Sequence, residues 1–376
     1  MKTANTRHSL NTAQASPPGA ICTTTAGGVF EAPLGGGLVS FSANALPGEK
    51  PAALLERLLS ECVRRKLVAV QGNVFSDPAL AEAVSVDFPI SWTGRHDTPE
   101  GDLRSARVLA LPEGSFERVE DSLGIRNGVL WETSDNRYLL LGALIPENPD
   151  ASAFAQVDLI WRRLKATLEK SKFALTDLVR TWFFNDHILD WYDDFNAART
   201  AFFNENNVFG SLVPASTGVG TSNALGALFT LDVLAVAPRT EKVSAIMVPS
   251  PLQCPANDYK SAFSRAVEVA GDEGRHLLVS GTAGIEPEGQ TAHLGDLDRQ
   301  IDLALRVVAA ILESRGMDWR NVSRAILYFP DVSWMPHYEA RRVALGLPDI
   351  PAIYAHCDVC RGDLLFEIEL DAFSFA

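Results

Sequence analysis

Hydrophobic residues recur along the chain in two patterns, one typical of strands and one typical of amphipathic helices, and segments of the two kinds alternate. Three segments carry apolar residues at the three-to-four-residue spacing of an amphipathic helix. Each is preceded by an apolar, glycine-containing stretch typical of a strand or hairpin. The predicted helices cover residues 51–66, 153–171 and 297–315, and the preceding strands lie near residues 38–46, 137–146 and 276–285.

The three segments also continue in a similar way. A second β-like run follows each helix and ends in an aromatic residue, one further residue and an aspartate, with the aspartates at Asp77, Asp186 and Asp331. A further helix is expected over residues 188–203 and 332–345, and it is abbreviated in the first segment. Apolar strands then close the segments at residues 107–111, 227–236 and 364–373.

This order predicts an α+β fold of three β-α-β-α-β units over residues 29–115, 116–238 and 243–376. The alternative is that unrelated β-α-β units look alike through generic patterning. If the repeat is real, we expect the three sheets to pack about a pseudo-threefold axis within one chain. Each interface between units is then a candidate cleft.

Composition and charge restrict the partners. The chain has 376 residues, 47% of them hydrophobic, and it contains no apolar run of the ~20 residues that a membrane span needs. Its formal net charge is −14, and no Lys/Arg run is present, so we expect neither a membrane nor a nucleic-acid partner. Such a charge repels anions, and an acidic substrate therefore requires its own local arginines.

Five cysteines, an odd and sparse set, are typical of a reducing compartment and predict a cytoplasmic protein. Residues 1–28 lack the apolar core of a signal peptide and are expected to form a flexible tail. Cys357 and Cys360 have the spacing of a redox or zinc pair, but a single such pair is a weak metal signal. We expect no metal and no cofactor.

The closing strand of the third unit carries three acidic residues at alternate positions. Period-two alternation places Glu367, Glu369 and Asp371 on one face, which by pattern alone is typical of a solvated acidic face. Aligning the closing strands of units two and three puts Thr230 at the position of Glu367. The carboxylate is therefore not repeated, and we expect one complete site, at the edge of unit three.

Three sequence blocks of unit three resemble the reactive-intermediate deaminase (RidA/YjgF) superfamily, whose members are trimers of such units with sites between subunits. These blocks are residues 279–285 (VSGTAGI), Gly295 and Asp296 with Gln300, and residues 365–369 (LFEIE). Residues 358–361 (DVCR), leading into that last block, are similar to the chorismatases, pyruvate-releasing enzymes on this fold. Tyr192, residues 195–196 (FN), Arg199 and the loop at residues 214–218 (PASTG) resemble further elements of that group.

The resemblance implies an enzyme that cleaves the enolpyruvyl ether of chorismate. A general acid protonates the methylene carbon, and water or the ring hydroxyl traps the resulting cation. Glu367 is the implied acid, and its pKa must then be raised by about two units, through burial beside Phe366 and Tyr354 and the charge of Glu369. The implied residues around a small anionic substrate are Arg361, Arg199, Tyr192, Cys360, Gly281, Thr282, Ala283, Tyr354, Thr217 and Gly218.

The chain departs from the imine deaminases at one point. Those enzymes carry a carboxylate-binding arginine after a Pro-Ala pair, whereas Ser216 and Ile353 follow the Pro-Ala pairs of this chain. A divergent imine or enamine deaminase and a non-catalytic ligand-binding protein remain as alternatives. Whether water or the ring hydroxyl traps the cation also stays open. The same holds for whether the chain is a monomer or a homo-oligomer.

Overall fold

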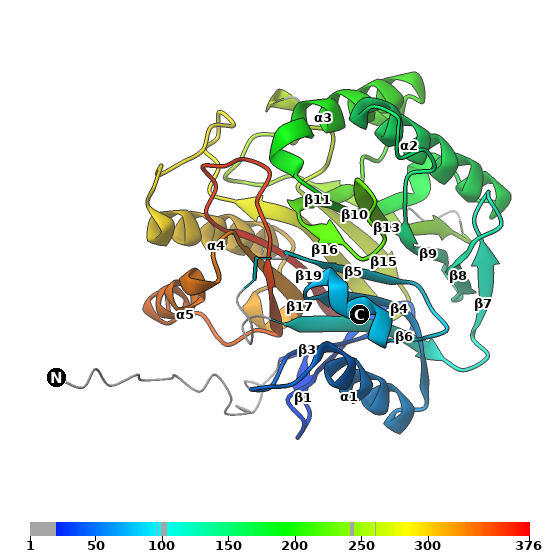
Figure 1. The fold of residues 1–376 in the computed structure, drawn as a ribbon, viewed down its shortest axis with the longest axis horizontal. Coiled ribbons are helices and arrows are strands. Elements are labelled where there is room, and N and C mark those ends of the chain that lie inside the picture. Colours follow the sequence, from blue (N-terminus) through cyan, green and yellow to red (C-terminus); the bar gives the residue numbers. More distant parts are fainter. Residues whose placement is uncertain (1–19, 96, 99–103, 241–243, 260) are drawn as a thin grey trace.

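The computed structural model describes residues 20–95, 97–98, 104–240, 244–259 and 261–376. These residues form three mixed β-sheets, each with helices on its outer face (Figure 1). The α+β class and the arrangement of three repeated units are therefore confirmed. None of the helices in the described part of the chain is long and apolar enough to cross a bilayer.

The first sheet has the strand order β1-β2-β3-β6-β4-β5-β12 and is covered by helix α1 (Pro51–Arg64). Proline opens this helix, where its missing N–H costs nothing. Its strands are β1 (Thr23–Thr24), β2 (Phe30–Gly35), β3 (Leu38–Asn44), β4 (Leu67–Phe75), β5 (Ile90–Gly94), β6 (Ser105–Pro112) and, from the second unit, β12 (Ser222–Asn223).

The second sheet has the order β11-β10-β13-β9-β8-β7. Helices α2 (Ala153–Lys170) and α3 (Ile188–Glu205) cover it, and Ser152 caps α2 by accepting from the Ala155 N–H. Its strands are β7 (Phe116–Glu120), β8 (Arg126–Glu132), β9 (Asn136–Leu144), β10 (Leu178–Asn185), β11 (Ala215–Gly220) and β13 (Phe229–Pro238).

The third sheet has the order β14-β15-β16-β19-β17-β18 and carries helices α4 (Leu297–Ser314) and α5 (Met335–Ala344). Asp296 caps α4, and the chain reverses after this helix at Gly316, whose φ is +69°. Its strands are β14 (Ala245–Val248), β15 (Ala266–Gly271), β16 (Gly274–Ala283), β17 (Val322–Phe329), β18 (Ala352–His356) and β19 (Glu367–Phe375).

Short 3-10 helices connect these elements. The second helix predicted for unit three divides into a 3-10 turn at Val332–Trp334 and α5, because Pro336 favours a new helix start there. The remaining 3-10 helices among the described residues are Pro78–Ala83, Leu175–Asp177, Val208–Gly210, Ala256–Tyr259 and Trp319–Asn321.

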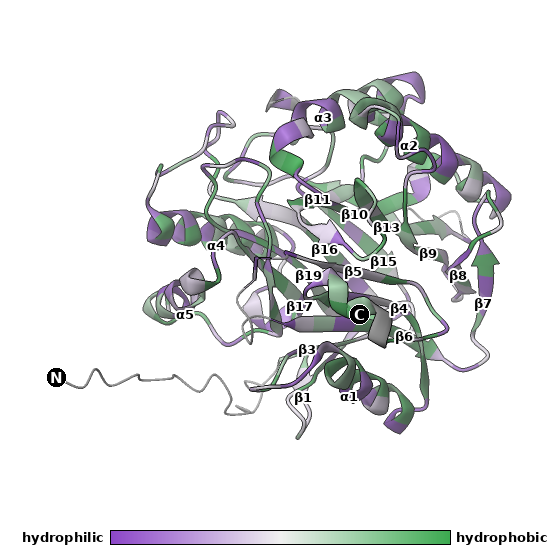
Figure 2. Ribbon diagram, viewed as in Figure 1, coloured by the Kyte–Doolittle hydropathy of each residue, from purple (hydrophilic) through white to green (hydrophobic). Residues whose placement is uncertain are grey.

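Two kinds of core hold the molecule together. Each sheet buries one face against its own helices, and the three opposite faces meet in a single central core. Phe75, Phe184 and Tyr328 meet there, one from each sheet, with ring centroids 5.8 and 6.4 Å from Phe75. Figure 2 shows hydrophobic positions along the inner strands and hydrophilic positions along the peripheral helices. The sheets therefore surround a pseudo-threefold axis, as the repeat predicted.

The aromatic-x-aspartate echo is shifted by one residue in unit three. Phe75 and Phe184 face the central core, but Phe329 packs on the helix side, and its neighbour Tyr328 takes the central place. The β-bulges support this register, since Phe184 and Tyr328 both lie four residues after the arginine at which pairing resumes. Equivalent positions are thus set by strand pairing rather than by the sequence echo.

The expected tail is described only in part. Residues 1–19 of the predicted tail over residues 1–28 lie outside the described residues. Thr23–Thr24 pair with β2, and the Ile21 N–H donates to the Arg320 carbonyl of the third unit at 3.1 Å. The described end of this segment is thus joined to the first sheet.

Candidate active site

The acidic face of β19 is buried. Glu367, Glu369 and Asp371 are 5%, 0% and 1% exposed, because this face of the third sheet lies against the second unit and the central core. The solvated face that the alternation alone suggested is therefore wrong. Burial of three carboxyl groups on one strand requires partners for their charge, and the structure supplies those partners unequally.

Glu367 lies in close contact with backbone. A Cβ atom built on Gly281 of the neighbouring strand would lie only 2.0 Å from Glu367 Oε1, so the carboxyl group holds this position only while residue 281 is glycine. The Gly281 N–H donates to Thr217 Oγ1 from β11 at 3.0 Å, and Ala283 pairs with Glu367 in register. Residues from both units two and three thus enclose the carboxyl group.

Glu369 and Glu367 have opposite electrostatic environments. Arg180 Nη2 contacts Glu369 at 2.6 Å, Arg324 Nη1 at 2.7 Å and the indole N–H of Trp182 at 3.0 Å. Burial alone would raise the pKa of Glu369, but the two arginines hold it below its usual range. Glu367 has no comparable cation among the residues that the structure describes: burial and the charge of Glu369 raise its pKa from 4.5 to about 8, against the opposing effect of Arg180.

Tyr192 and Cys360 form the next part of the site. The Tyr192 side chain, on α3, is hydrogen-bonded to the Cys360 side chain, and Ser261 and Asn196 also bond Tyr192. Burial and the nearby Glu367 raise the pKa of Cys360 to about 12, so this group is a neutral thiol at physiological pH. The structure therefore brings the predicted residues Tyr192 and Cys360 to Glu367.

Arg199 lies behind Tyr192 on the same helix. Its Nη2 donates to Asn196 Oδ1 at 2.8 Å and its Nη1 to Ser216 Oγ at 3.5 Å, and the guanidinium is 4.6 Å from the centre of the Phe195 ring. The residue is only 3% exposed. A buried guanidinium beside a partly buried cluster is a suitable group to hold a carboxylate.

Arg361 borders the cluster from the loop before β19. Its Nη1 donates to the Gly289 carbonyl at 2.8 Å, and its charge lowers the pKa of the adjacent Cys360, against the larger effect of burial. Arg361 and Arg199 thus approach the Tyr192 and Cys360 pair from two different units.

The other predicted residues have local roles. Thr282 is buried and its hydroxyl donates to the Ser280 carbonyl at 2.9 Å, while Gly218 lies in β11 opposite Phe183. Tyr354 does not join the cluster. Its hydroxyl donates to Glu339 of α5 at 2.7 Å, and its ring and that of Phe366 pack in the helix-side core, on the other face of the sheet from Glu367. Glu369, rather than these two rings, is what lies beside the acid.

Sequence reasoning missed the arginines that hold Glu369. Arg180 and Arg324 each stand alone within an otherwise largely apolar strand, β10 and β17, and are at most 1% exposed. A lone arginine in a strand buried on both faces needs a buried acceptor for its guanidinium, and an acid is one such acceptor. That pattern was the available signal.

Cys357 and Cys360 are both free thiols. Within the described ranges, no three His, Cys, Asp or Glu side chains gather so that they could hold a metal ion.

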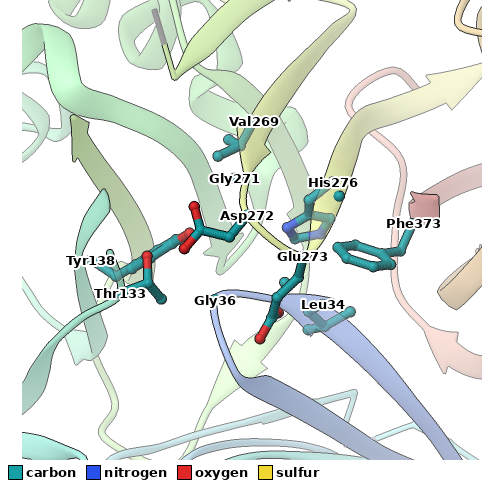
Figure 3. A pocket seen from close by; sticks show the side chains of 12 residues that line it. Leu34, Gly36, Thr133, Tyr138, Val269, Gly271, Asp272, Glu273, His276 and Phe373 are labelled. Atoms are coloured by element: carbon teal, nitrogen blue, oxygen red, sulfur yellow. The ribbon is translucent and has the colours of Figure 1, made fainter. Parts of the chain in front are cut away.

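Two hollows lie elsewhere, and Glu367 lines neither. A cavity of about 60 Å³ lies where the β2–β3, β8–β9 and β15–β16 turns of the three units meet, with Tyr138, Glu273 and His276 among its lining residues (Figure 3). It is far smaller than the roughly 300 Å³ or more of ordinary ligand pockets. An open groove of about 890 Å³ lies over β7, β8 and the end of α2 and carries both basic and acidic side chains.

No family model matches the chain. A 3-hydroxybenzoate synthase from Streptomyces hygroscopicus is 26% identical over 309 residues, which are 73% of this chain and 85% of that protein. A Mycobacterium tuberculosis member of the YjgF/YER057c/UK114 family matches 35% of this chain and all of its own, at 26% identity and a TM-score of 0.27.

A crystal structure of a chorismatase superposes on most of the molecule. It covers 81% of this chain and 92% of its own length with a TM-score of 0.63, at 21% identity. At that identity the superposition is evidence of fold. Together with the three sheets about one axis, it confirms the resemblance seen in the sequence: this chain has the three-unit α+β fold of a chorismatase.

Proposed function

We propose that this protein converts chorismate and releases pyruvate. Glu367 donates its proton to the methylene carbon of the enolpyruvyl group, which leaves a cation at the ether carbon. An oxygen nucleophile adds to that carbon, the bond between the ether oxygen and the side chain breaks, and pyruvate departs. With water as the nucleophile, one water is consumed and the ring product is a dihydroxycyclohexadiene. Formation of a hydroxybenzoate also breaks one ring C–O bond and one ring C–H bond, so the ring loses one water as it becomes aromatic and this route consumes none overall.

One observation carries this proposal: the Glu367 carboxyl group is 5% exposed and lies beside Glu369, and this burial and charge raise its pKa to about 8. At pH 7 a group with that pKa is protonated in about nine molecules of ten, whereas an ordinary glutamate is protonated in fewer than about one in a hundred. A carboxylic acid that keeps its proton at neutral pH is suited to protonate carbon.

The surrounding residues suit an anionic substrate. Chorismate carries two carboxylates, and the net charge of −14 disfavours their approach unless cations lie close by. We assign Arg199 and Arg361 to these carboxylates, because they reach the Tyr192 and Cys360 pair from opposite units. Tyr192, the neutral Cys360 thiol and the backbone at Gly281 then form the less charged wall beside the reacting atoms.

The comparisons support the substrate class. The 3-hydroxybenzoate synthase aligns with 73% of this chain, and the chorismatase structure covers 81% of it. The name of the first relative favours a hydroxybenzoate as the ring product, and we propose this branch over the dihydroxycyclohexadiene.

The test is incubation of the purified protein with chorismate. Pyruvate is measured by a coupled lactate dehydrogenase assay, and the ring product is identified by its mass and ultraviolet spectrum. We expect pyruvate and one aromatic hydroxybenzoate in equal amounts. A product heavier by one water would retain the chorismatase function and reject the hydroxybenzoate branch. Absence of pyruvate, with ammonia released from 2-aminoacrylate instead, would replace the proposal by a deaminase.

A further inference from the structure

A buried charge network runs from the centre of the molecule to Glu367. Arg324 makes two hydrogen bonds of 2.9 Å to the Asp371 carboxylate and a third of 2.7 Å to Glu369. Glu369 also accepts from Arg180 and from the Trp182 indole. The Arg180 guanidinium lies 4.8 Å, and that of Arg324 5.4 Å, from the centre of the same indole ring. These side chains come from units two and three and fix one another in place.

The network is balanced without Glu367. Two guanidinium cations, Arg180 and Arg324, make direct ion pairs with two carboxylates, Glu369 and Asp371. A third buried guanidinium, Arg107, lies 5.2 Å from the centre of the Trp182 ring and bonds Asn73, which in turn bonds Asp232, and His276 contacts Asp371 at 3.2 Å. Glu367 lies on the same face of β19, about 6.7 Å along the strand from Glu369. An ionised Glu367 would add an uncompensated negative charge to this buried set of ion pairs. Its ionisation is therefore unfavourable.

We propose that Glu369 is a positioning residue for the acid: Arg180, Arg324 and Trp182 hold it ionised, and its fixed negative charge keeps the proton on Glu367. This inference rests on the proposed role of Glu367. Glu369 itself contacts no substrate in this account. It acts through the neighbouring carboxyl group.

The other groups near Glu367 do not supply a fixed negative charge. Arg180 from β10 is the opposing cation, and its Nη2 is shared between Glu369 and the Thr217 hydroxyl at 2.6 and 2.7 Å. Strands β11 and β16 present Thr217 and Gly281, which carry no charge. Tyr328 on β17 pairs with Glu367, and the thiols Cys357 and Cys360 lie before β19; burial raises the pKa of all three, so they are neutral. The charge of Arg361 lowers the pKa of Cys360.

The second unit contains a matched arrangement without the acid. Asp232 occupies the position of Glu369 and accepts from Asn73, Ser91 and the Ala143 N–H at 2.7, 2.6 and 2.8 Å. Thr230 stands at the position of Glu367, opposite Phe184 as Glu367 is opposite Tyr328. Units two and three therefore both have a hydrogen-bonded carboxyl group at the position of Glu369. A second carboxyl group lies beside it in unit three but not in unit two. Asp232→Asn is thus a matched control for loss of a buried acid.

The experiment is an infrared pH titration of the full-length protein without substrate. The carbonyl stretch of the protonated Glu367 is isolated by subtracting the spectrum of Glu367→Gln. Glu369→Gln removes the negative charge, and we expect the midpoint of this band to fall by about 1–3 pH units. Arg180→Met removes the opposing cation and should raise the midpoint. Asp232→Asn should leave it in place.

Opposite shifts in the two variants are the signature of charge, because a general loosening of the fold would move both midpoints toward that of an exposed glutamate. If Glu369→Gln does not fold, Arg180→Met carries the test alone. An unchanged or lowered midpoint in Arg180→Met, or an unchanged one in folded Glu369→Gln, would overturn the inference. Since no turnover is involved, a correct titration with no pyruvate release would reject the proposed function and retain the inference.

Discussion

Glu367 Oε1 occupies the space that a side chain on residue 281 would need. The Cβ of any residue other than glycine at position 281 would lie 2.0 Å from that oxygen, far inside van der Waals contact. The carboxyl group must move if a methyl group is added, because it is the far end of a flexible side chain, whereas the Gly281 N–H is held by Thr217 Oγ1 at 3.0 Å.

Gly281→Ala should therefore lower pyruvate release by at least about 100-fold while the protein remains folded, since a displacement of about 1 Å is enough for such a loss. The measurement is kcat/KM for chorismate, with circular dichroism as the check on folding. Gly362→Ala is the control, because a Cβ at that position would meet its nearest atom only at 4.0 Å. Equal activity of the two variants would show that the carboxyl does not act from its observed position.

The raised pKa of Glu367 has a consequence for stability. Below pH 4.5 this carboxyl is protonated in both the folded and the unfolded chain. Between pH 4.5 and about 8 the unfolded chain loses the proton and the folded protein keeps it, so the stability contribution falls as the pH rises. Glu367→Gln has no such titration.

The free energy of unfolding of the wild type, relative to Glu367→Gln, should thus fall by about 4 kcal/mol between pH 4.5 and 8. Urea denaturation of both proteins across this range measures it. A difference that stays constant with pH would mean that Glu367 titrates as an ordinary surface carboxyl.

The cysteines should be largely unreactive in the native protein. Burial raises the pKa of Cys22, Cys62 and Cys360 to about 12, and that of Cys357 is also raised. At pH 8 such thiols are almost entirely protonated, and the thiolate is the reactive form. Cys254 and Cys360 are the two partly exposed cysteines. Because its raised pKa keeps Cys360 as a thiol, we expect a disulfide reagent to modify Cys254 alone rapidly, and all five cysteines after unfolding. Cys254→Ser should abolish the rapid phase; rapid modification of Cys360 would contradict the buried site.

Arg199 provides a test of substrate anchoring. Its guanidinium is held by Asn196 and by the Phe195 ring, an arrangement that suits a planar fork rather than an ammonium group. Arg199→Lys should raise KM for chorismate by about 10- to 100-fold, the loss of one charged hydrogen bond, with a smaller change in kcat. Arg162→Lys, on the exposed face of α2 with Asp158 and Glu205, is the control. Equal KM values for both variants would remove Arg199 from the binding site.

The fold was predictable because its periodicity is local. The helix over residues 297–315 and the strand over residues 276–285 follow from apolar spacing and from Asp296 and Gly316 at the helix ends, and the structure has them within two residues. The register of unit three was not predictable from the aromatic-x-aspartate echo. Tyr328 and Phe329 are both large and apolar, and only the β-bulge before Arg324 decides which of them faces the centre.

Residues of the candidate site could be named from the sequence where a residue type has few structural roles. Glu367 was proposed from alternation and the family resemblance; Cys360 lies near it, Tyr192 lies next to Cys360, and Arg199 lies next to Tyr192. Tyr354 was misplaced, because alternation within β18 does not state which face lies inward. The network around Glu369 depends on pairing between β10 and β19 of different units, nearly 190 residues apart, which no local pattern encodes.

The most direct test of the account is the pH dependence of pyruvate release from chorismate by the wild type and by Glu367→Gln. The account predicts activity at neutral pH that declines as the pH rises through about 8, with a loss of at least about 100-fold in the variant at every pH. Activity that rises through pH 8, or a variant as active as the wild type, would contradict it.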